Sequence, residues 1–340
     1  MNSFNIKVQN DKILNVAETL AHILDCMSKS HDIFLFIDES PDLATVMLGE
    51  QTFVTVLKTL CETINYNPNR ISIEIENLVQ SDCWPNIIKC YRSVDVFHCQ
   101  GISFSVGKKI KYKTSIFVGG SRWPRLSLAS YLYAQHKDDS MISYWQNLKD
   151  KHQPCYLYLD DLFKHHMIKG IDHKFIDQVN DLVKALPLHL DQSDRDKNTN
   201  GGFINFTEAY DLLPKYNQVY CDIVCETVHN GQTFAFTEKI ARCWMTKTPF
   251  LVFGPRNYLS NLSKLGFRTF TSFWDESYDL YDNATRINLM KRQINLIHNK
   301  NYQQLEQIYQ SSEMQDILDN NYRVFKKLDK EKILKTFNIT

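Results

Sequence analysis

Hydrophobic and polar positions in the N-terminal third of the chain follow two alternating patterns. From residue 13 to 27, apolar side chains recur every three or four positions, which predicts a helix with one buried face. Residues 31–40 then form an apolar run that ends in Asp38, Glu39 and a serine, which is typical of a buried strand with acids at its carboxyl end. The alternation continues with one more helix and three strands, at residues 52–65, 71–75, 94–97 and 102–106. This order predicts an open α/β sheet.

A second series of elements follows a basic run at residues 108–113. The pattern there predicts a strand, a turn at Gly119 and Gly120, and a helix with Pro124 in its first position. The first of these strands is at residues 114–118. Farther along, strands at 219–225 and 250–253 alternate with helices, of which one is at 257–265, and only helices follow beyond residue 283. A second α/β unit is therefore expected, with Gly266 ending the helix at 257–265.

Length and composition fit two ordinary globular domains. The chain has 340 residues, of which 43% are hydrophobic, and this suffices for two separate cores. The predicted units are residues 1–110, residues 111–283, and C-terminal helices at 284–340 that pack back across the space between the two. A polar stretch at 191–202 predicts either a surface loop or a mobile lid.

Charge and cysteine usage narrow the environment in which the chain works. Lys plus Arg number 39 and Asp plus Glu also 39, so any contact with DNA requires a local patch. The four lysines of residues 108–113 are either such a patch or a solvated linker. The nine cysteines form no Cys-x-x-Cys pair, which favours reduced thiols and a cytoplasmic protein. No apolar run approaches the ~20 residues of a membrane span, and no signal peptide is recognisable.

Two segments at strand ends carry residues suited to bind an anion. In open α/β sheets, ligands collect where strands end and helices begin. The first segment runs from Gly119 to Arg125, where glycines let the backbone approach a ligand and Arg122 and Arg125 can grip phosphate. The alternative is that both arginines are solvated while Trp123 covers the core.

The second segment follows the strand at residues 219–225. Thr237 suits a helix cap and Glu238 the first helical turn. Lys239 is electrostatically misplaced at a helix N-terminus unless an anion shares the site. Glu238 can then accept hydrogen bonds from ribose hydroxyls while Lys239 binds a diphosphate. The alternative is a capped surface helix with a solvated lysine.

The order of these residues resembles a nucleotide-sugar signature. The α-1,3-fucosyltransferase family carries an acid, a Thr-Glu-Lys triplet and a Pro-x-x-x-x-Gly strand, and the matching positions here are Glu226, Thr237, Glu238, Lys239, Pro249 and Gly254. Arg125, with Leu132 seven residues later, is similar to the arginine helix of those enzymes. The resemblance covers residues 114–266 and implies a GT-B fold of two facing Rossmann-like domains. It also implies that Arg125 and Lys239 bind the diphosphate of a UDP- or GDP-sugar and that Glu238 binds the ribose.

A further segment, residues 264–279, resembles glycosyltransferase-like proteins of tailed phages and giant viruses. Glycosyltransferases of such viruses commonly modify hydroxymethylated bases of the viral DNA, of the 5-hydroxymethylcytosine type, while others build glycans. The resemblance implies a transferase in the host cytoplasm whose acceptor is either a base in phage DNA or a glycan.

An inverting transfer needs a base on the unit that faces the donor. Asp38 and Glu39 end the first buried strand of that unit and are the predicted catalytic residues. The alternative for either residue is an Asx turn before Pro41 that caps the local structure. Glu50 and His98 are weaker candidates.

No metal and no tightly bound cofactor is expected. The acids stand in adjacent pairs rather than as Asp-x-Asp, namely Asp138 with Asp139 and Asp160 with Asp161. Two further groups have spacings that fit no zinc module, namely His165 and His166 with His173, and Cys83, Cys90, His98 and Cys99. The phosphate-binding motifs of kinases and dehydrogenases are missing. The rival from another class is a noncatalytic binding or assembly protein that retains a nucleotide-sugar fold.

Overall fold

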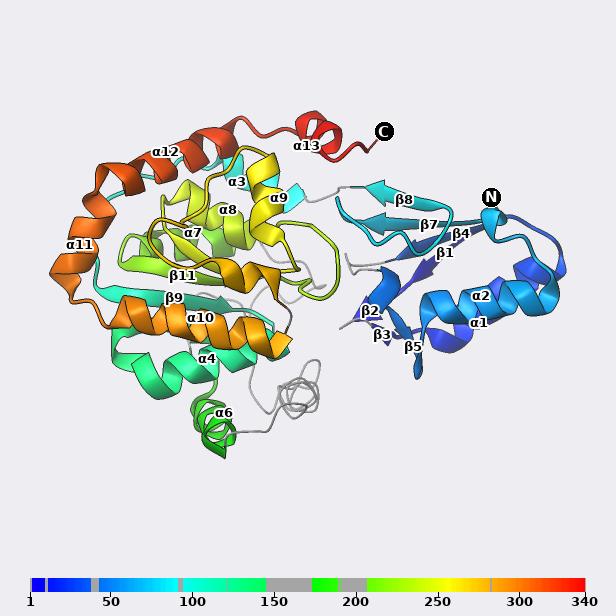
Figure 1. Ribbon diagram of the computed structural model, residues 1–340, viewed down its shortest axis with the longest axis horizontal. Coiled ribbons are helices and arrows are strands. Elements are labelled where there is room, and N and C mark those ends of the chain that lie inside the picture. Colours follow the sequence, from blue (N-terminus) through cyan, green and yellow to red (C-terminus); the bar gives the residue numbers. More distant parts are fainter. Residues whose placement is uncertain are drawn as a thin grey trace.

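The chain has an α/β fold in which two parallel sheets are flanked by helices (Figure 1). The computed structural model describes residues 2–9, 12–37, 43–90, 94–120, 122–144, 173–188, 190, 207–281 and 283–339, so the predicted loop or lid at 191–202 lies outside the described residues. One sheet belongs to a smaller lobe and the other to a larger lobe (Figure 1). Each has its own cluster of buried apolar side chains. The predicted α/β class is confirmed.

The smaller lobe is built on four parallel strands in the order β1, β4, β7, β8. Their bounds are Asn2–Ile6, Ile33–Ile37, Ile71–Glu76 and Ile87–Cys90. In the two central strands every second residue is buried, namely Ile33, Leu35, Ile37, Ile71, Ile73 and Ile75. The helices are α1 (Val16–Ser28) and α2 (Phe53–Ile64), with short turns at η1 (Leu43–Thr45) and η2 (Pro68–Arg70). A small second sheet joins β2 (Val8–Gln9), β3 (Lys12–Ile13), β5 (Met47–Leu48) and β6 (Gln51–Thr52).

The larger lobe is built on four parallel strands in the order β10, β9, β11, β12. In chain order their bounds are Tyr112–Val118 for β9, Ser140–Tyr144 for β10, Val219–Cys225 for β11 and Phe250–Phe253 for β12. All residues of β10, β11 and β12 are buried, as expected for a parallel sheet covered on both faces.

Helices surround this sheet, which is called the larger sheet because it belongs to the larger lobe. They are α4 (Trp123–His136), α6 (His173–Ala185), α7 (Thr207–Tyr216), α8 (Glu238–Met245), α9 (Tyr258–Lys264) and α10 (Asn283–His298), with turns η3 (Lys137–Asp139) and η6 (Ser277–Leu280). Three C-terminal helices then run over the outside of the larger lobe towards the smaller one: α11 (Tyr302–Gln310), α12 (Ser312–Lys326) and α13 (Lys330–Thr336) (Figure 1). None of the described helices is long and apolar enough to cross a membrane.

Two strands predicted in the N-terminal third are wrong. Residues 94–97 belong to helix α3, Val94–Gly101, and residues 102–106 have no regular secondary structure. Val96 and Cys99 lie three positions apart and are both buried, so this short apolar run also fits one face of a helix. Both side chains belong to the core of the larger lobe, although they precede residue 111. The division into domains at that residue stays a prediction.

The basic run at residues 108–113 is not a solvated linker. The Lys108 Nζ donates to a backbone oxygen and to the hydroxyl of Thr248, each at 2.8 Å. Lys113 is 9% exposed, and its Nζ lies 3.0 Å from the carboxylate of Asp139. Two of the four lysines are therefore used inside the fold, and the run does not present four exposed cations to DNA.

The carboxyl ends of the two parallel sheets face each other. In Figure 1 the arrowheads of β7 and β8 point towards the larger lobe, and that of β9 points towards the smaller lobe. The loop after β7 contacts the loop after β11. The backbone N–H of Leu78 in the first loop donates to the backbone oxygen of Phe234 in the second at 2.8 Å. Loops at both carboxyl edges are thus in contact.

Candidate functional site

The larger sheet reverses its strand order between β9 and β11. From β9 the chain moves outwards to β10 on one side, and from β11 it moves outwards to β12 on the other. At such a point the loops that follow two adjacent strands run apart, which leaves room for a ligand outside the carboxyl ends. Here the two loops lead into α4 and α8, the helices at which the sequence predicts anion binding. In the parallel sheet of the smaller lobe, the described strands β1, β4, β7 and β8 follow one another in chain order without such a reversal.

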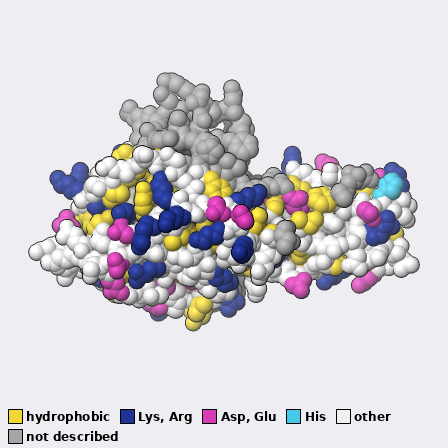
Figure 2. Space-filling model, turned by 90° about the horizontal axis from the view of Figure 1, so that it is seen from above, with side chains coloured by type: hydrophobic (Ala, Val, Ile, Leu, Met, Phe, Trp, Pro, Cys, Tyr) yellow, Lys and Arg dark blue, Asp and Glu magenta, His cyan; other side chains and the backbone are white. Residues whose placement is uncertain are grey.

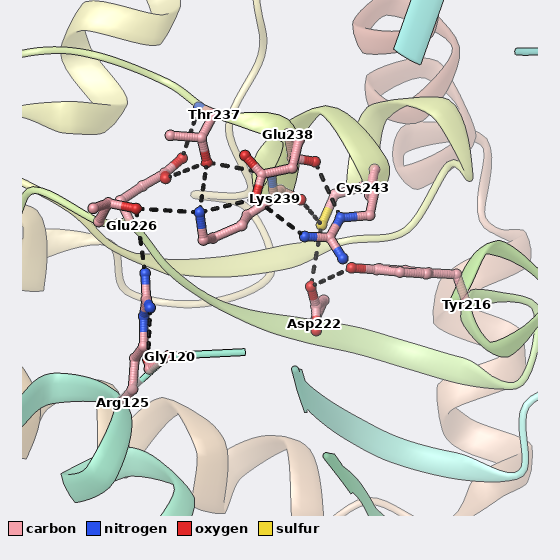
Figure 3. Close-up of polar contacts among 11 residues, drawn as sticks. Gly120, Arg125, Tyr216, Asp222, Glu226, Thr237, Glu238, Lys239 and Cys243 are labelled. Carbon is pink, nitrogen blue, oxygen red and sulfur yellow. Dashed lines mark hydrogen bonds and ion pairs between the residues drawn. The ribbon is translucent and has the colours of Figure 1, made fainter. Parts of the chain in front are cut away.

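Thr237 caps helix α8, as predicted. Its hydroxyl accepts a hydrogen bond from the backbone N–H of Lys239 at 3.3 Å. The cap is held by Glu226, which is 2% exposed and accepts from the Thr237 hydroxyl at 2.6 Å and from its N–H at 3.3 Å (Figure 3). The same carboxylate accepts from the hydroxyl of Tyr258 at 2.8 Å. Glu226 therefore positions the start of α8, and its direct contact with a donor stays a prediction.

Glu238 and Lys239 form a largely buried ion pair. The Lys239 Nζ lies 3.0 Å from the Glu238 carboxylate, and the two side chains are 18% and 15% exposed. Arg242, one turn later, approaches the same carboxylate at 3.5 Å. Burial alone would raise the pKa of Glu238, but attraction to Lys239 and Arg242 outweighs it and lowers the pKa to about 2. The solvated-lysine alternative is therefore wrong, and the chain itself supplies one anion to Lys239.

Arg125 brings a second cation to this place from helix α4. It is 7% exposed, and its guanidinium donates to the Gly120 backbone oxygen at 2.7 Å and to the Thr227 hydroxyl at 3.4 Å. The Lys239 Nζ donates to the same hydroxyl at 3.3 Å, so cations from two helices converge on one oxygen (Figure 3). Burial lowers the pKa of Arg125, and the charge of Arg122 adds to this. No carboxylate in the described part of the chain forms an ion pair with Arg125.

The residues around Arg125 agree in part with each of the two predictions for this segment, arginines that bind phosphate or solvated arginines beside a Trp123 that covers the core. Arg122 is the N-cap residue of α4 and is half-buried. Trp123 is 4% exposed and packs edge-on against Phe253 of β12, with ring centroids 5.4 Å apart. One alternative was that Trp123 covers the core while both arginines are solvated. Its statement about Trp123 is confirmed, but its statement that Arg125 is solvated is wrong.

Gly254, at the end of β12, is required by close packing. A Cβ at this position would lie 2.6 Å from the ring of Tyr258, closer than nonbonded atoms approach. Tyr258 begins helix α9, whose N-terminus is filled by Asp279. The Asp279 carboxylate accepts from the backbone N–H of Tyr258 at 3.1 Å and from that of Leu259 at 2.9 Å. The start of α9 is thus occupied by a carboxylate of the chain itself.

Three side chains that the sequence did not single out belong to the site, namely Thr227, Arg242 and Tyr258. Arg242 could have been found, because it lies four residues after Glu238, the spacing at which opposite charges pair on a helix. Thr227 carries no local signal, since its contacts come from α4 and α8. Tyr258 reaches Glu226 only because β12 lies beside β11.

The predicted catalytic residues, Asp38 and Glu39, lie outside the described residues, directly after β4. Glu50 is exposed in the turn between β5 and β6, and His98 is part of helix α3. The assignment of a base therefore stays a prediction.

Among the residues that the structure describes, the acids, histidines and cysteines weighed as metal ligands form no metal-binding group. Asp139 pairs with Lys113 and accepts a hydrogen bond from the hydroxyl of Tyr302 at 2.7 Å. Residues 160–166 lie outside the described ranges. In the ranges that are described, no three His, Cys, Asp or Glu side chains come close enough to hold a metal ion. Metal independence stays a prediction.

No protein-family model matches the chain, and no curated protein matches it in sequence. The likeness to α-1,3-fucosyltransferases therefore stays one of motif residues. Function has to be inferred from the side chains at the carboxyl edge of the larger sheet.

Proposed function

We propose that the chain is a GT-B-type glycosyltransferase that moves a sugar from a UDP- or GDP-sugar to an acceptor hydroxyl. The acceptor is a hydroxymethylated base in DNA or a glycan. The proposal rests on a switch point in the larger sheet, on cations from two helices beside it, and on carboxyl edges that face each other across the lobes.

The observation that carries the proposal is the environment of Arg125. Arg125 forms no ion pair within the described residues, although the carboxylates of Glu238 and Glu226 act on its charge from a greater distance. Burial lowers its pKa nonetheless, so an anionic ligand in contact with the guanidinium would stabilise its charged form. Arg125 and Lys239 both donate to Thr227, so a diphosphate oxygen that displaces this hydroxyl would meet both cations at once. The start of α8 adds the positive end of the helix dipole.

Glu238 is suited to bind the ribose of the donor. With a pKa of about 2 it is ionised near neutral pH and acts only as a hydrogen-bond acceptor. Its ion pairs with Lys239 and Arg242 fix the carboxylate in position, as binding of a ribose diol requires.

In the proposed reaction a base removes the proton of the acceptor hydroxyl, and the oxygen attacks the anomeric carbon. The bond from that carbon to the diphosphate breaks, and its electrons leave with the nucleoside diphosphate. Arg125 and Lys239 would stabilise this developing charge. Asp38 or Glu39 is the proposed base, because both follow β4, which is parallel to β7 and ends at the edge facing the larger lobe.

Thermal shift measurements against a panel of UDP- and GDP-sugars test donor binding. At least one donor should raise the melting temperature, and Lys239→Gln should weaken its binding about tenfold or more, because a phosphate contact is lost. Lys247→Gln is the matched control, since Lys247 is also a half-buried lysine of the larger lobe and pairs with Asp319 at 2.6 Å.

No stabilisation by any nucleotide sugar would overturn the transferase proposal. Release of nucleoside diphosphate in the presence of hydroxymethylated DNA or a glycan then tests catalysis. Donor binding without turnover on either acceptor class would favour the noncatalytic alternative.

A further inference from the structure

The C-terminal segment carries a local excess of positive charge in a chain of zero net charge. Residues 320–340 contain six Lys and Arg against two acids. Six exposed cations form the C-terminal basic face. They lie on α12, at its C-cap, on α13 and in the loop after α9, and are Arg268, Arg323, Lys327, Lys330, Lys332 and Lys335. Figure 2, which looks onto this side of the molecule, shows Lys and Arg side chains gathered over the larger lobe towards the smaller one.

The cations of this face are available to a partner. No carboxylate of the described ranges forms an ion pair with any of the six. The neighbouring Asp329 uses its carboxylate to cap α13 by accepting from the N–H of Lys332 at 2.7 Å. Lys326, by contrast, is half-buried and donates to the backbone oxygen of Ile102 at 3.2 Å, so it is not part of the face.

The C-terminal basic face is packed against the elements of the candidate site. Phe325 of α12 contacts Trp244 of α8, with ring centroids 5.7 Å apart. Phe337, after α13, contacts Phe234 in the loop before α8, with ring centroids 5.3 Å apart. A partner held on this face therefore lies close to the loop that carries the cap of α8.

The face also extends to the smaller lobe. Burial raises the pKa of the Cys90 thiol in β8 to about 11, and the positive charge of Lys330 counteracts part of this rise. In Figure 1, α13 lies at the end of the larger lobe that is next to the smaller lobe, in agreement with this effect.

The distribution of the cations selects the kind of partner. They are spread over two helices and a loop rather than directed at one point, which suits a polyanion more than a small anion. Helices that bind anionic membranes insert apolar side chains beside their basic ones. Here the core takes the apolar side chains of α12 and α13, including Met314, Ile317, Leu318, Phe325 and Ile333. Among the described residues, the large exposed apolar side chains all lie elsewhere, at Leu14, Leu24, Ile64, Ile88, Leu280, Tyr281 and Leu296.

The geometry points to nucleic acid as the partner. The C-terminal basic face binds the phosphate backbone and holds a strand beside the carboxyl edge of the larger sheet. That this nucleic acid is also the acceptor of the sugar rests on the proposed function, whereas its binding does not.

Fluorescence anisotropy with a labelled oligonucleotide, single-stranded and as a duplex, tests this inference without any nucleotide sugar. The triple variant K327E/K330E/K332E should bind at least about tenfold more weakly and with a smaller salt dependence between about 50 and 200 mM, since it loses phosphate contacts. Lys330 and Lys332 lie in the first turn of α13, where glutamate suits the helix dipole, so the fold should persist. The control K7E/K58E/K184E makes the same change of charge at exposed lysines elsewhere and should bind as the wild type does.

Equal affinities of the two triple variants would overturn the assignment of this face. Wild-type protein that binds phosphatidylserine vesicles but no oligonucleotide would show that the partner is a membrane, and binding to neither would also overturn the inference. Oligonucleotide binding through this face without stabilisation by any nucleotide sugar would instead overturn the transferase proposal alone.

Discussion

Helices α8 and α9 begin at the same edge of the larger sheet, but their N-termini are neutralised in different ways. At α9, the chain places the carboxylate of Asp279 on the N–H groups of the first turn. At α8, the cap is the neutral Thr237, and the cations Arg125, Lys239 and Arg242 lie beside it together with the carboxylates of Glu226 and Glu238. The start of α9 is thus closed by one carboxylate, whereas cations from two helices converge at the start of α8.

A buried arginine lies beside each helix start. Arg286 is 1% exposed and donates to the backbone oxygens of Tyr278 and Asp279, each at 3.2 Å, and to that of Gly254, and its charge acts on the Asp279 carboxylate. Arg125 is buried almost as deeply and donates to only one backbone oxygen, while the carboxylates of Glu238 and Glu226 act on it without forming an ion pair within the described residues. A helix N-terminus offers an anion site only where the protein does not fill it.

Asp279→Ala should have the largest effect. It removes the acceptor of two backbone N–H groups and leaves buried Arg286 without its carboxylate, so the free energy of unfolding should fall by about 3 to 4 kcal/mol. Urea denaturation measures this. Asp275→Ala is the control, because Asp275 also accepts hydrogen bonds from a turn but is exposed, and it should cost about 1 kcal/mol. Equal costs would show that the start of α9 is not closed by Asp279.

Arg125→Met should affect binding rather than stability. Methionine fills much of the same space without a charge, so the unliganded protein should keep its free energy of unfolding within about 1 kcal/mol. Affinity for the nucleotide sugar should fall about 100-fold, as titration calorimetry can measure.

Arg286→Met provides the contrast to this variant. It should destabilise the fold by about 3 kcal/mol, because Asp279 then stays buried without its cation. If both methionine variants destabilise the protein alike, Arg125 is a structural residue and the difference between the two helix starts disappears.

Local signals in the sequence were sufficient for much of the fold. Gly266 ends α9 with a φ of +95°, the left-handed conformation that the glycine predicted. The apolar spacing after residue 283 correctly predicted the buried face of α10, made up of Ile287, Met290, Ile294 and Ile297. The failure at residues 94–97 has a physical reason, since four apolar-rich positions do not distinguish a strand from a helix turn.

The candidate site was predictable only in its local part. The cap at Thr237 follows from its place before a helix, and the Glu238 pair with Arg242 follows from helix spacing. The convergence of Arg125 and Lys239 on Thr227 depends on the neighbouring positions of β9 and β11, which no local pattern encodes. The contacts of the half-buried Lys108 were equally hidden, because its acceptors are Thr248 and a backbone oxygen far along the chain.

Stability as a function of pH should give the smallest effect, with opposite signs at the two helix starts. The pKa of Glu238, about 2, lies below its ordinary value of 4.5, so its contribution is present above about pH 4.5 and is lost as the pH falls towards 2. Burial raises the pKa of Asp279 from 3.8 to about 6, so its contribution is present below about pH 3.8 and is lost as the pH rises through 6.

Urea denaturation of non-titrating variants isolates each group. Relative to Asp279→Asn, the wild type should lose about 1 kcal/mol per pH unit as the pH rises from about 4 to 6. Relative to Glu238→Gln, it should lose a similar amount per unit as the pH falls below about 4.5. Because the cations around α8 stabilise the ionised form and burial at α9 favours the neutral form, the two differences must change in opposite directions with pH. Changes in the same direction would mean that the two carboxylates have similar surroundings.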